Sequence, residues 1–414
     1  MKTIGIVAEY NPFHKGHAHQ VRMVRETTGA EHVVAIMSGN YVQRGEPAMF
    51  NKWIRTEMAL AAGVDLVLEL PVAIATSSAE GFAAGAVRGL AATGVVDGLC
   101  FGSEGGELGP LDDLAALFLE EPPAYREALG RHLQEGLAFP KARAEAAREV
   151  LQAQREALEP LLHSPNNILG IEYLKALRKY RLPLEAVTIR RKGAGYHAED
   201  PGLPFPSATA IRKHLREHGM DHSLEPMLPD TSYRLMLAHM DAWKGARVHP
   251  DMFFPFLQYR ILQMDPGTMA GIQGIREGLE HRIKEKAREA TSWEGLLGAL
   301  QTKRYPATAL SRALLHILLD LKEDRLREQM EGGGCRYLRI LGFRKEAGGL
   351  LHRMKRNASL PLVSNVADSM GALKGPARSQ LLEETASTEV YNLALATRLG
   401  IRGRNDFTQS LVVL

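Results

Sequence analysis

The chain has 414 residues, of which 45% are hydrophobic and 24% charged, a balance that excludes an intrinsically disordered protein and allows one large core or two domains. Its formal net charge of +3 is too small to indicate nucleic-acid binding by itself, because soluble proteins normally expose charges of both signs. The two cysteines form no CxxC pair, which argues against a disulfide framework or a thiolate zinc site and favours a reducing compartment. The first residues lack a signal-peptide pattern, and no apolar run reaches membrane-spanning length, so we expect a cytoplasmic protein.

Short apolar runs alternate with helical patterns through the first hundred residues. They predict buried strands at Thr3–Ala8, His32–Met37, Asp65–Leu70 and Gly98–Phe101, because none shows the polar alternation of a half-exposed strand. This order is typical of the α/β class, with a doubly wound, Rossmann-type parallel sheet covered by helices. Ligands of such sheets bind at the carboxyl ends of the strands, so the loops that follow the strands are the candidate site.

The rest of the chain is predominantly helical in pattern. Residues 110–162 predict a charged helical insertion, and a further strand is expected at Ala186–Arg190. Strand signals then fade, and amphipathic patterns dominate from Ser232 to Leu326. We therefore predict a first domain at 1–224 that carries the sheet and a mostly α-helical C-terminal domain at 225–414.

The segment Ala8–His17, with the sequence AEYNPFHKGH, joins the first predicted strand to a helix. A strand end, a turn with glycine and a helix N-terminus together present N–H groups and the positive end of the helix dipole to an anion. His14 and His17, with Gly16 between them to allow close approach, can both donate to negative charge on a transferring phosphoryl group. The simpler alternative is that His14 and His17 are solvent-exposed residues of a turn, with no role in phosphate binding. A zinc site that also uses His19 lacks a nearby cysteine or an HExxH helix, so we predict no metal ligands here.

This segment resembles the first motif of the HxGH nucleotidyltransferase superfamily, whose members bind ATP in this loop and transfer an adenylyl group with release of pyrophosphate. A second segment, Pro206–Arg212 (PSATAIR), resembles the late SxTxIR motif of the superfamily. In that motif Ser207, Thr209 and Arg212, at a helix start, would contact the β and γ phosphates. Without the resemblance, Ser207 and Thr209 are merely helix-cap residues.

Further segments look like the bacterial tRNA(Met) cytidine acetate ligase family: Met37–Ala48, Phe101–Glu104, Ser164–Gly170, Arg190–Arg191 leading to Tyr196–His197, and more loosely Gly278–Arg282 and Thr302–Tyr305. The resemblance implies an enzyme that activates acetate with ATP to acetyl-adenylate. The acetyl group would then pass to the exocyclic amine of the wobble cytidine of elongator tRNA(Met), giving N4-acetylcytidine. ATP would be a substrate, accompanied by Mg²⁺; no protein partner is implied.

By motif, the resemblance implies catalytic roles for His14 and His17 in stabilising phosphate. It implies an ATP site made of Val7, Ala8, Glu9, Tyr10, Asn11, Pro12, Phe13, His14, Lys15, Gly16, His17, Ala18, His19, Gln20, Gly102, Asn166, Asn167, Arg190, Arg191, Ser207, Thr209 and Arg212. A glycine leaves room for a base or ribose, and an asparagine can form hydrogen bonds with either. An arginine can make a bidentate contact with phosphate. Which asparagine of the pair 166–167 and which arginine of the pair 190–191 contacts the nucleotide stays open. The alternatives are that Gly102 forms a simple turn, that the asparagine caps a helix and that the arginine is an ordinary surface residue.

Two regions are candidates for the other substrates. Gln43, Arg44 and Glu46 follow the second strand and could shape the acetate or cytidine end, unless they form an ordinary solvated loop. Basic residues are dense between Arg276 and Arg356, which suits contact with an RNA backbone, the alternative being a solvated helix face. From this region we select as tRNA contacts Arg282, Lys303, Arg304, Arg336 and Arg339.

Two other functions stay open at this point. A small-molecule adenylyl- or cytidylyltransferase would use the same nucleotide site but would not need the basic helical half. A non-catalytic RNA-binding factor would bind tRNA without releasing pyrophosphate.

Overall fold

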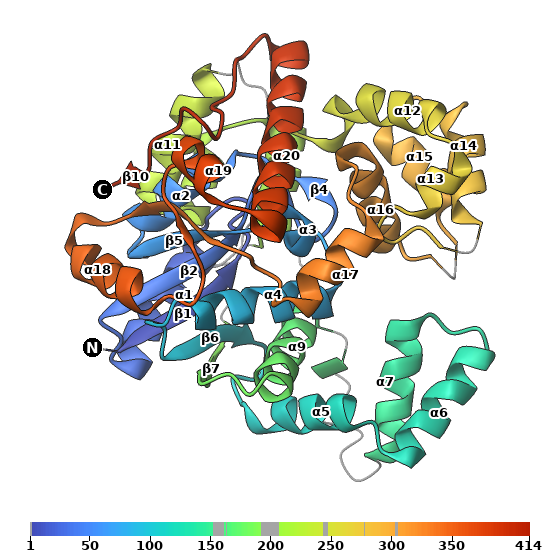
Figure 1. The fold of residues 1–414 in the computed structure, drawn as a ribbon, viewed down its shortest axis with the longest axis horizontal. Helices are drawn as coiled ribbons and strands as arrows, with labels where there is room; N and C mark the ends of the chain where they lie inside the picture. Colours follow the sequence, from blue (N-terminus) through green and yellow to red (C-terminus); the bar gives the residue numbers. More distant parts are fainter. Residues whose placement is uncertain are drawn as a thin grey trace.

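One mixed sheet runs through the centre of the molecule, with helices on both of its faces and further helices extending from it (Figure 1). The structure, a computed structural model, describes residues 2–151, 161–162, 164–191, 207–242, 247–276, 278–302 and 305–414. In the part of the chain that it describes, no helix combines the length and the apolar character needed to cross a membrane.

Eight strands form the sheet, in the order β10-β8-β5-β2-β1-β6-β7, with β9 paired to β8. Their bounds are β1 Thr3–Ala8, β2 His32–Ser38, β5 Leu66–Leu70, β6 Gly98–Ser103, β7 Glu185–Arg190, β8 Leu338–Phe343, β9 Leu362–Val363 and β10 Val412–Val413. The strands from β5 to β7 in this order are parallel, whereas β8 is antiparallel to β5. A separate antiparallel hairpin follows β2 and consists of β3 Tyr41–Val42 and β4 Glu46–Pro47.

The five strands predicted in the first half are confirmed, and so is the α/β class. The fading of strand signals after Pro226 was misleading, because β8, β9 and β10 belong to the same sheet. β8 carries Arg339 within an apolar run, and this charge masks the strand; the carboxylates of Glu69 and Asp406 make its burial possible. The second half thus completes the sheet of the first, and the domain boundary at 224 stays a prediction.

Helices cover the two faces of the sheet in pairs. α1 Lys15–Thr28 and α2 Lys52–Ala61 cover one face, and α4 Ala79–Ala92 and α9 Pro165–Lys179 cover the other. Successive side chains of a strand point to opposite faces of the sheet. In β2, Val33, Ala35 and Met37 therefore pack with α1 and α2, whereas Val34 and Ile36 pack with α4 and α9. Both faces are apolar, as the unbroken hydrophobic runs predict.

The other helices lie in three stretches of the chain. In the first half they are α3 Val72–Ala75, α5 Gly109–Glu120, α6 Pro123–Gln134 and α7 Phe139–Val150. In the second half they are α10 Ala208–His218, η2 His222–Met227, α11 Asp230–Ala242, η3 Pro250–Met252, α12 Phe254–Gln263, α13 Pro266–Ala270, α14 Leu279–Ala287, α15 Trp293–Leu300, α16 Ala307–Leu319 and α17 Glu323–Glu331. They end with η4 Lys345–Ala347, α18 Gly348–Asn357, α19 Val366–Ala372 and α20 Gly375–Leu399. α5, α6 and α7 confirm the predicted helical insertion up to residue 151; residues 152–160 lie outside the described part.

The topology identifies where a ligand should bind. From β1 the chain goes to β2 and β5 on one side, then returns to β6 and β7 on the other. The carboxyl ends of β1 and β6 therefore meet where the strand order reverses, which is the usual ligand crevice of open α/β sheets. The loop after β1 carries the two histidines.

Candidate functional site

His14 and His17 cap the N-terminus of α1 reciprocally. The Gly16 N–H donates to His14 Nδ1 over 3.0 Å, and the His14 N–H donates to His17 Nδ1 over 3.2 Å. The two rings stack with centroids 3.8 Å apart. This is a capping box built from imidazoles in place of the usual hydroxyl and carboxylate.

These hydrogen bonds set the tautomer of both histidines. Since each Nδ1 accepts a hydrogen bond, each neutral ring carries its hydrogen on Nε2, at the opposite edge of the imidazole. Burial first, and then the nearby Arg191 and Arg212, lower the pKa of His14 to about 3. Burial and the neighbouring His14 and Arg191 also lower the pKa of His17 well below its usual value. The site therefore offers two neutral Nε2–H donors in a positive field, which suits an anion.

Gly16 is required by the position of the His14 ring. A β-carbon at Gly16 would lie 2.8 Å from Cε1 and 3.0 Å from Nδ1 of His14. The glycine between the two histidines therefore serves close contact with a side chain, and not an unusual backbone angle.

α10 brings the second motif to the first. The Arg212 guanidinium donates to the carbonyl of Asn11 over 2.8 Å and to the Thr209 hydroxyl over 3.4 Å. The Ser207 hydroxyl accepts from Ala210 N–H and caps the helix. The positive end of this helix and an arginine thus adjoin the loop of the histidines, although about two hundred residues separate them in sequence.

A cluster of polar side chains around Glu104, at the end of β6, lies on the other side of the crevice from the loop of the histidines. Its carboxylate accepts from Ser164 Oγ over 3.0 Å and from Asn166 Nδ2 over 3.1 Å, and Arg191 Nε lies 3.8 Å away. Arg191 also donates to Asn166 Oδ1 over 3.3 Å. A β-carbon at Gly102 would lie 3.1 Å from Arg191 Cγ, so this glycine leaves room for the arginine.

The geometry separates the members of each ambiguous pair. Asn167 is fully buried and accepts the Glu104 N–H on Oδ1, whereas Asn166 contacts Arg191. Both arginines are partly exposed, but the Arg190 Cβ lies where a side chain at Gly106 would be, while Arg191 is close enough to lower the pKa of His14. The residues that converge are Asn166 and Arg191; their contact with a nucleotide stays a prediction.

Sequence reasoning missed Arg55 on α2, which binds three loops of the site. Its buried guanidinium donates to the carbonyls of Glu9, Gly39 and Phe50. Burial lowers its pKa to about 10, while the negative fields of Tyr391, Glu9 and Glu69 oppose that shift. α2 also carries Lys52 and Glu57, so its sequence does not single out Arg55, and the partners of Arg55 lie in other segments.

The β3–β4 hairpin is tied to the same loop. Glu9 Oε1 accepts the Gln43 N–H over 2.7 Å, and burial raises the pKa of Glu9 despite that bond and the nearby arginines 212, 44 and 55. Burial and Arg212 lower the pKa of Arg44. The hairpin therefore borders the site, as its position after β2 suggests.

The other residues of the predicted loop play different parts. Tyr10 and Phe13 are core side chains, so any contact of theirs with a nucleotide would use the backbone. Asn11 Oδ1 accepts the Met49 N–H, and His19 Nδ1 lies 3.1 Å from Arg22 Nη2. Half-buried side chains complete the loop: Val7, Lys15, Ala18 and Gln20. Ala8 and Pro12 are buried.

Of the residues predicted to contact tRNA, the three that the structure describes all have partners within the protein. Arg282 on α14 donates to the Ala299 carbonyl, and Arg336 donates to the carbonyls of Gly332 and Glu328. Arg339 was a wrong choice for an RNA contact, because its side chain is 3% exposed and pairs with Glu69 and Asp406. Lys303 and Arg304 lie outside the described residues.

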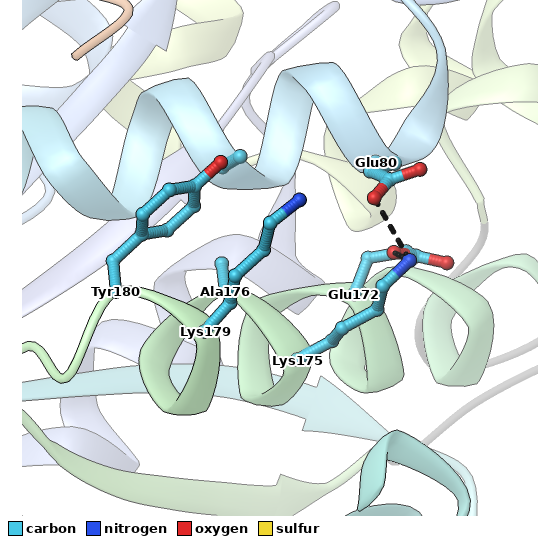
Figure 2. A pocket seen from close by; sticks show the side chains of 7 residues that line it. Glu80, Glu172, Lys175, Ala176, Lys179 and Tyr180 are labelled. Atoms are coloured by element: carbon cyan, nitrogen blue, oxygen red, sulfur yellow. Dashed lines mark hydrogen bonds and ion pairs between the residues drawn. The ribbon is translucent and has the colours of Figure 1, made fainter. Parts of the chain in front are cut away.

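A surface hollow between α4 and α9 is a different feature (Figure 2). Lys175 Nζ lies 2.9 Å from a Glu80 oxygen and 3.5 Å from one of Glu172, and Arg143 of α7 also pairs with Glu172. These ion pairs occupy the hollow and fasten α7 and α4 to α9. It belongs to the scaffold, not to the crevice at the strand ends.

Comparisons with known proteins identify the family and the fold. A family model described as HIGH Nucleotidyl Transferase matches residues 1–404. Proteins named tRNA(Met) cytidine acetate ligase are 37% identical in Acetivibrio thermocellus, covering 100% of both chains, and 36% identical in Halothermothrix orenii, covering 98% of both.

Two solved structures of Thermotoga maritima TmcAL, 32% identical to this chain and covering 100% of both chains, superpose with TM-scores of 0.94 for an apo form and 0.90 for a form bound to alpha-thio ATP. The chain is a member of the tRNA(Met) cytidine acetate ligase family of HIGH nucleotidyl transferases.

Proposed function

We propose that this chain uses ATP to activate acetate and then acetylates N4 of the wobble cytidine of elongator tRNA(Met). The observation that carries the proposal is the pair of neutral Nε2–H donors of His14 and His17, set beside Arg191 and Arg212 at the crevice of the sheet. Membership of the family supports the same reaction.

The reaction needs two displacements. An acetate oxygen attacks the α phosphorus of ATP, the bond from the α phosphorus to the bridging oxygen breaks, and pyrophosphate leaves with the electron pair. The cytidine N4 then attacks the acetyl carbonyl, AMP leaves, and N4 loses a proton. The two imidazole donors and the two arginines would stabilise the charge that develops on the phosphates, and the fixed loops would align the reactants.

Mg²⁺ would enter with ATP. Among the described residues, no group of three or more His, Cys, Asp or Glu side chains is placed to hold a metal ion. Phosphate oxygens and water would hold the ion, which would neutralise charge on the triphosphate.

The test of the histidines is His17→Ala. Acetate-dependent release of pyrophosphate should fall by about a hundredfold or more, because loss of one donor of this kind typically costs that much. His222→Ala, at an exposed position of η2, is the control and should keep full activity. Unchanged turnover in a folded His17→Ala protein would refute the role.

The test of the reaction is to incubate the protein with ATP, labelled acetate and tRNA transcripts and to look for acetylcytidine by mass spectrometry. We expect the label in elongator tRNA(Met). Nucleotidyl transfer to a small phosphate ester without labelled tRNA would favour a small-molecule nucleotidyltransferase. Binding of tRNA with no release of pyrophosphate would favour a non-catalytic factor.

A further inference from the structure

Arginine and histidine side chains gather where the C-terminal end of α10, the start of η3 and the end of α20 meet. Arg247 donates to the carbonyls of Leu215 and Arg216 over 2.7 and 2.9 Å, which places its guanidinium at the end of α10. His249 is the residue before η3, and η3 contacts α20. Arginine and histidine side chains from segments distant in sequence thus lie on one surface.

The chain after α20 adds to this surface. α20 ends at Gly400 in a left-handed conformation, and Asn392 Nδ2 then donates to the Arg404 carbonyl over 3.0 Å, so the tail folds back along the helix. From residue 390 to 405 the sequence has Arg398, Arg402 and Arg404 and no acid. All three are exposed, and none makes a side-chain hydrogen bond or ion pair with another described residue. The next acid, Asp406, is buried among cations of the core and does not neutralise them.

The positive charges of this surface are close enough to lower the pKa of neighbouring groups. Burial and Arg216 lower the pKa of Arg247. Burial lowers the pKa of His249; Asp251 opposes this, and Arg247 and Arg398 add to it. The Asp251 carboxylate also accepts the Trp293 N–H, so it is shared with the backbone. A surface whose cations are close enough to disfavour each other's charge is suited to a polyanion.

α10 connects this surface to the nucleotide site. Arg212, which contacts the loop of the histidines, and Arg216 are four residues apart and so lie on the same side of the helix. The 11 residues of α10 span about 16 Å, the rise of about five stacked nucleotides of one strand. A polynucleotide whose reacting base lies at the head of α10 would carry its flanking phosphates past the tail of α10.

We propose that Arg216, Arg247, His249, Arg398, Arg402 and Arg404, here called the α10–α20 basic patch, bind the phosphate backbone of the tRNA beside the base that is acetylated. The inference rests on the proposed function. It assigns the RNA backbone to a surface other than the region 276–356 favoured by the density of basic residues in the sequence.

The experiment uses the full chain with Arg398, Arg402 and Arg404 all changed to glutamate. The control changes Lys355 and Arg356, two exposed cations of α18, to glutamate. Binding of elongator tRNA(Met) is measured by fluorescence anisotropy over a range of salt concentrations. The patch variant should bind at least about tenfold more weakly, and its salt dependence should lose a slope of about 2 to 3, close to one for each phosphate contact removed. Acetate-dependent exchange of pyrophosphate into ATP should stay at the wild-type rate.

Two results would overturn the patch: affinity and salt slope equal to those of wild type, or an equal loss in the α18 control. The proposed function fails separately, if wild type forms no acetylcytidine. In that case a selective loss of tRNA binding in the patch variant would still support the patch.

Discussion

At the scale of single residues, the HxGH pattern is explained by contacts within one helix turn. His14 and His17 cap α1 through Nδ1 and leave Nε2–H as the donor. Gly16 makes this possible because it lacks the β-carbon that would strike the His14 ring. The histidines are thus fixed as neutral donors before any ligand binds, which is the preorganisation that electrostatic catalysis requires.

Gly16→Ala should therefore separate activity from stability. Alanine favours the helix by up to about 1 kcal/mol, but its methyl group displaces the His14 ring, so release of pyrophosphate should drop at least about tenfold while the melting temperature changes little. The control is Gly130→Ala in α6, where a β-carbon has no neighbour within 4 Å and activity should be unchanged. Full activity in Gly16→Ala, measured by pyrophosphate exchange, would contradict this explanation.

At the scale of elements, α2 is the part that holds the site together. Arg55 donates to carbonyls from the loops after β1 and β2 and from the segment after β4. It does so with one planar group whose several donors point in fixed directions, which a lysine cannot imitate. The loops that carry the chemistry are therefore positioned by a helix that contributes no predicted catalytic residue.

Arg55→Lys should destabilise the protein by about 3 kcal/mol, because at least one buried carbonyl loses its partner, and should raise the KM for ATP as the loops loosen. The unfolding free energy is measured by chemical denaturation. As a control, Arg126→Lys at an exposed position of α6 should change the stability by less than about 0.5 kcal/mol. Equal stability of the two variants would refute the role of Arg55.

At the scale of the whole molecule, a buried charge cluster joins both halves of the chain. Lys52 of α2 lies 2.7 Å from Glu69 of β5 and 2.8 Å from Asp406 of the tail, and Arg339 of β8 lies 2.9 Å from both carboxylates. Burial, and then the charge of Glu69, raise the pKa of Glu384 of α20, whose carboxyl group lies 3.8 Å from Lys52. Two cations and three carboxyl groups thus lie together in the core.

Asp406→Asn should lower the free energy of unfolding at pH 7 by about 3 kcal/mol, because Lys52 and Arg339 lose a partner while they stay buried. Burial raises the pKa of Asp406, but Lys52 and Arg339 outweigh it and bring the pKa down to about 2, below the usual 3.8. The stabilisation is therefore complete above about pH 4 and is lost as the pH falls through 2. The gap between wild type and variant should close over that interval in denaturation curves.

The matched control for this variant is Asp113→Asn at an exposed position of α5, which should alter stability by less than about 0.5 kcal/mol at any pH. Asp406→Asn with wild-type stability at pH 7 would show that the cluster does not hold the tail.

The sequence by itself determined what local patterns encode: the strands β1, β2, β5, β6 and β7 with the helices between them, and the two motifs around His14 and Arg212. Strand alternation, helix periodicity and turn chemistry act over a few residues, so they can be read without knowing the fold. Only the tertiary structure decided that Arg191 and Asn166 converge, that Arg55 holds three loops and that β8 is a strand. The reason is that a buried charge needs a partner, and for Arg339 that partner lies at Glu69, 270 residues earlier in the chain. No window of sequence contains both halves of such an interaction.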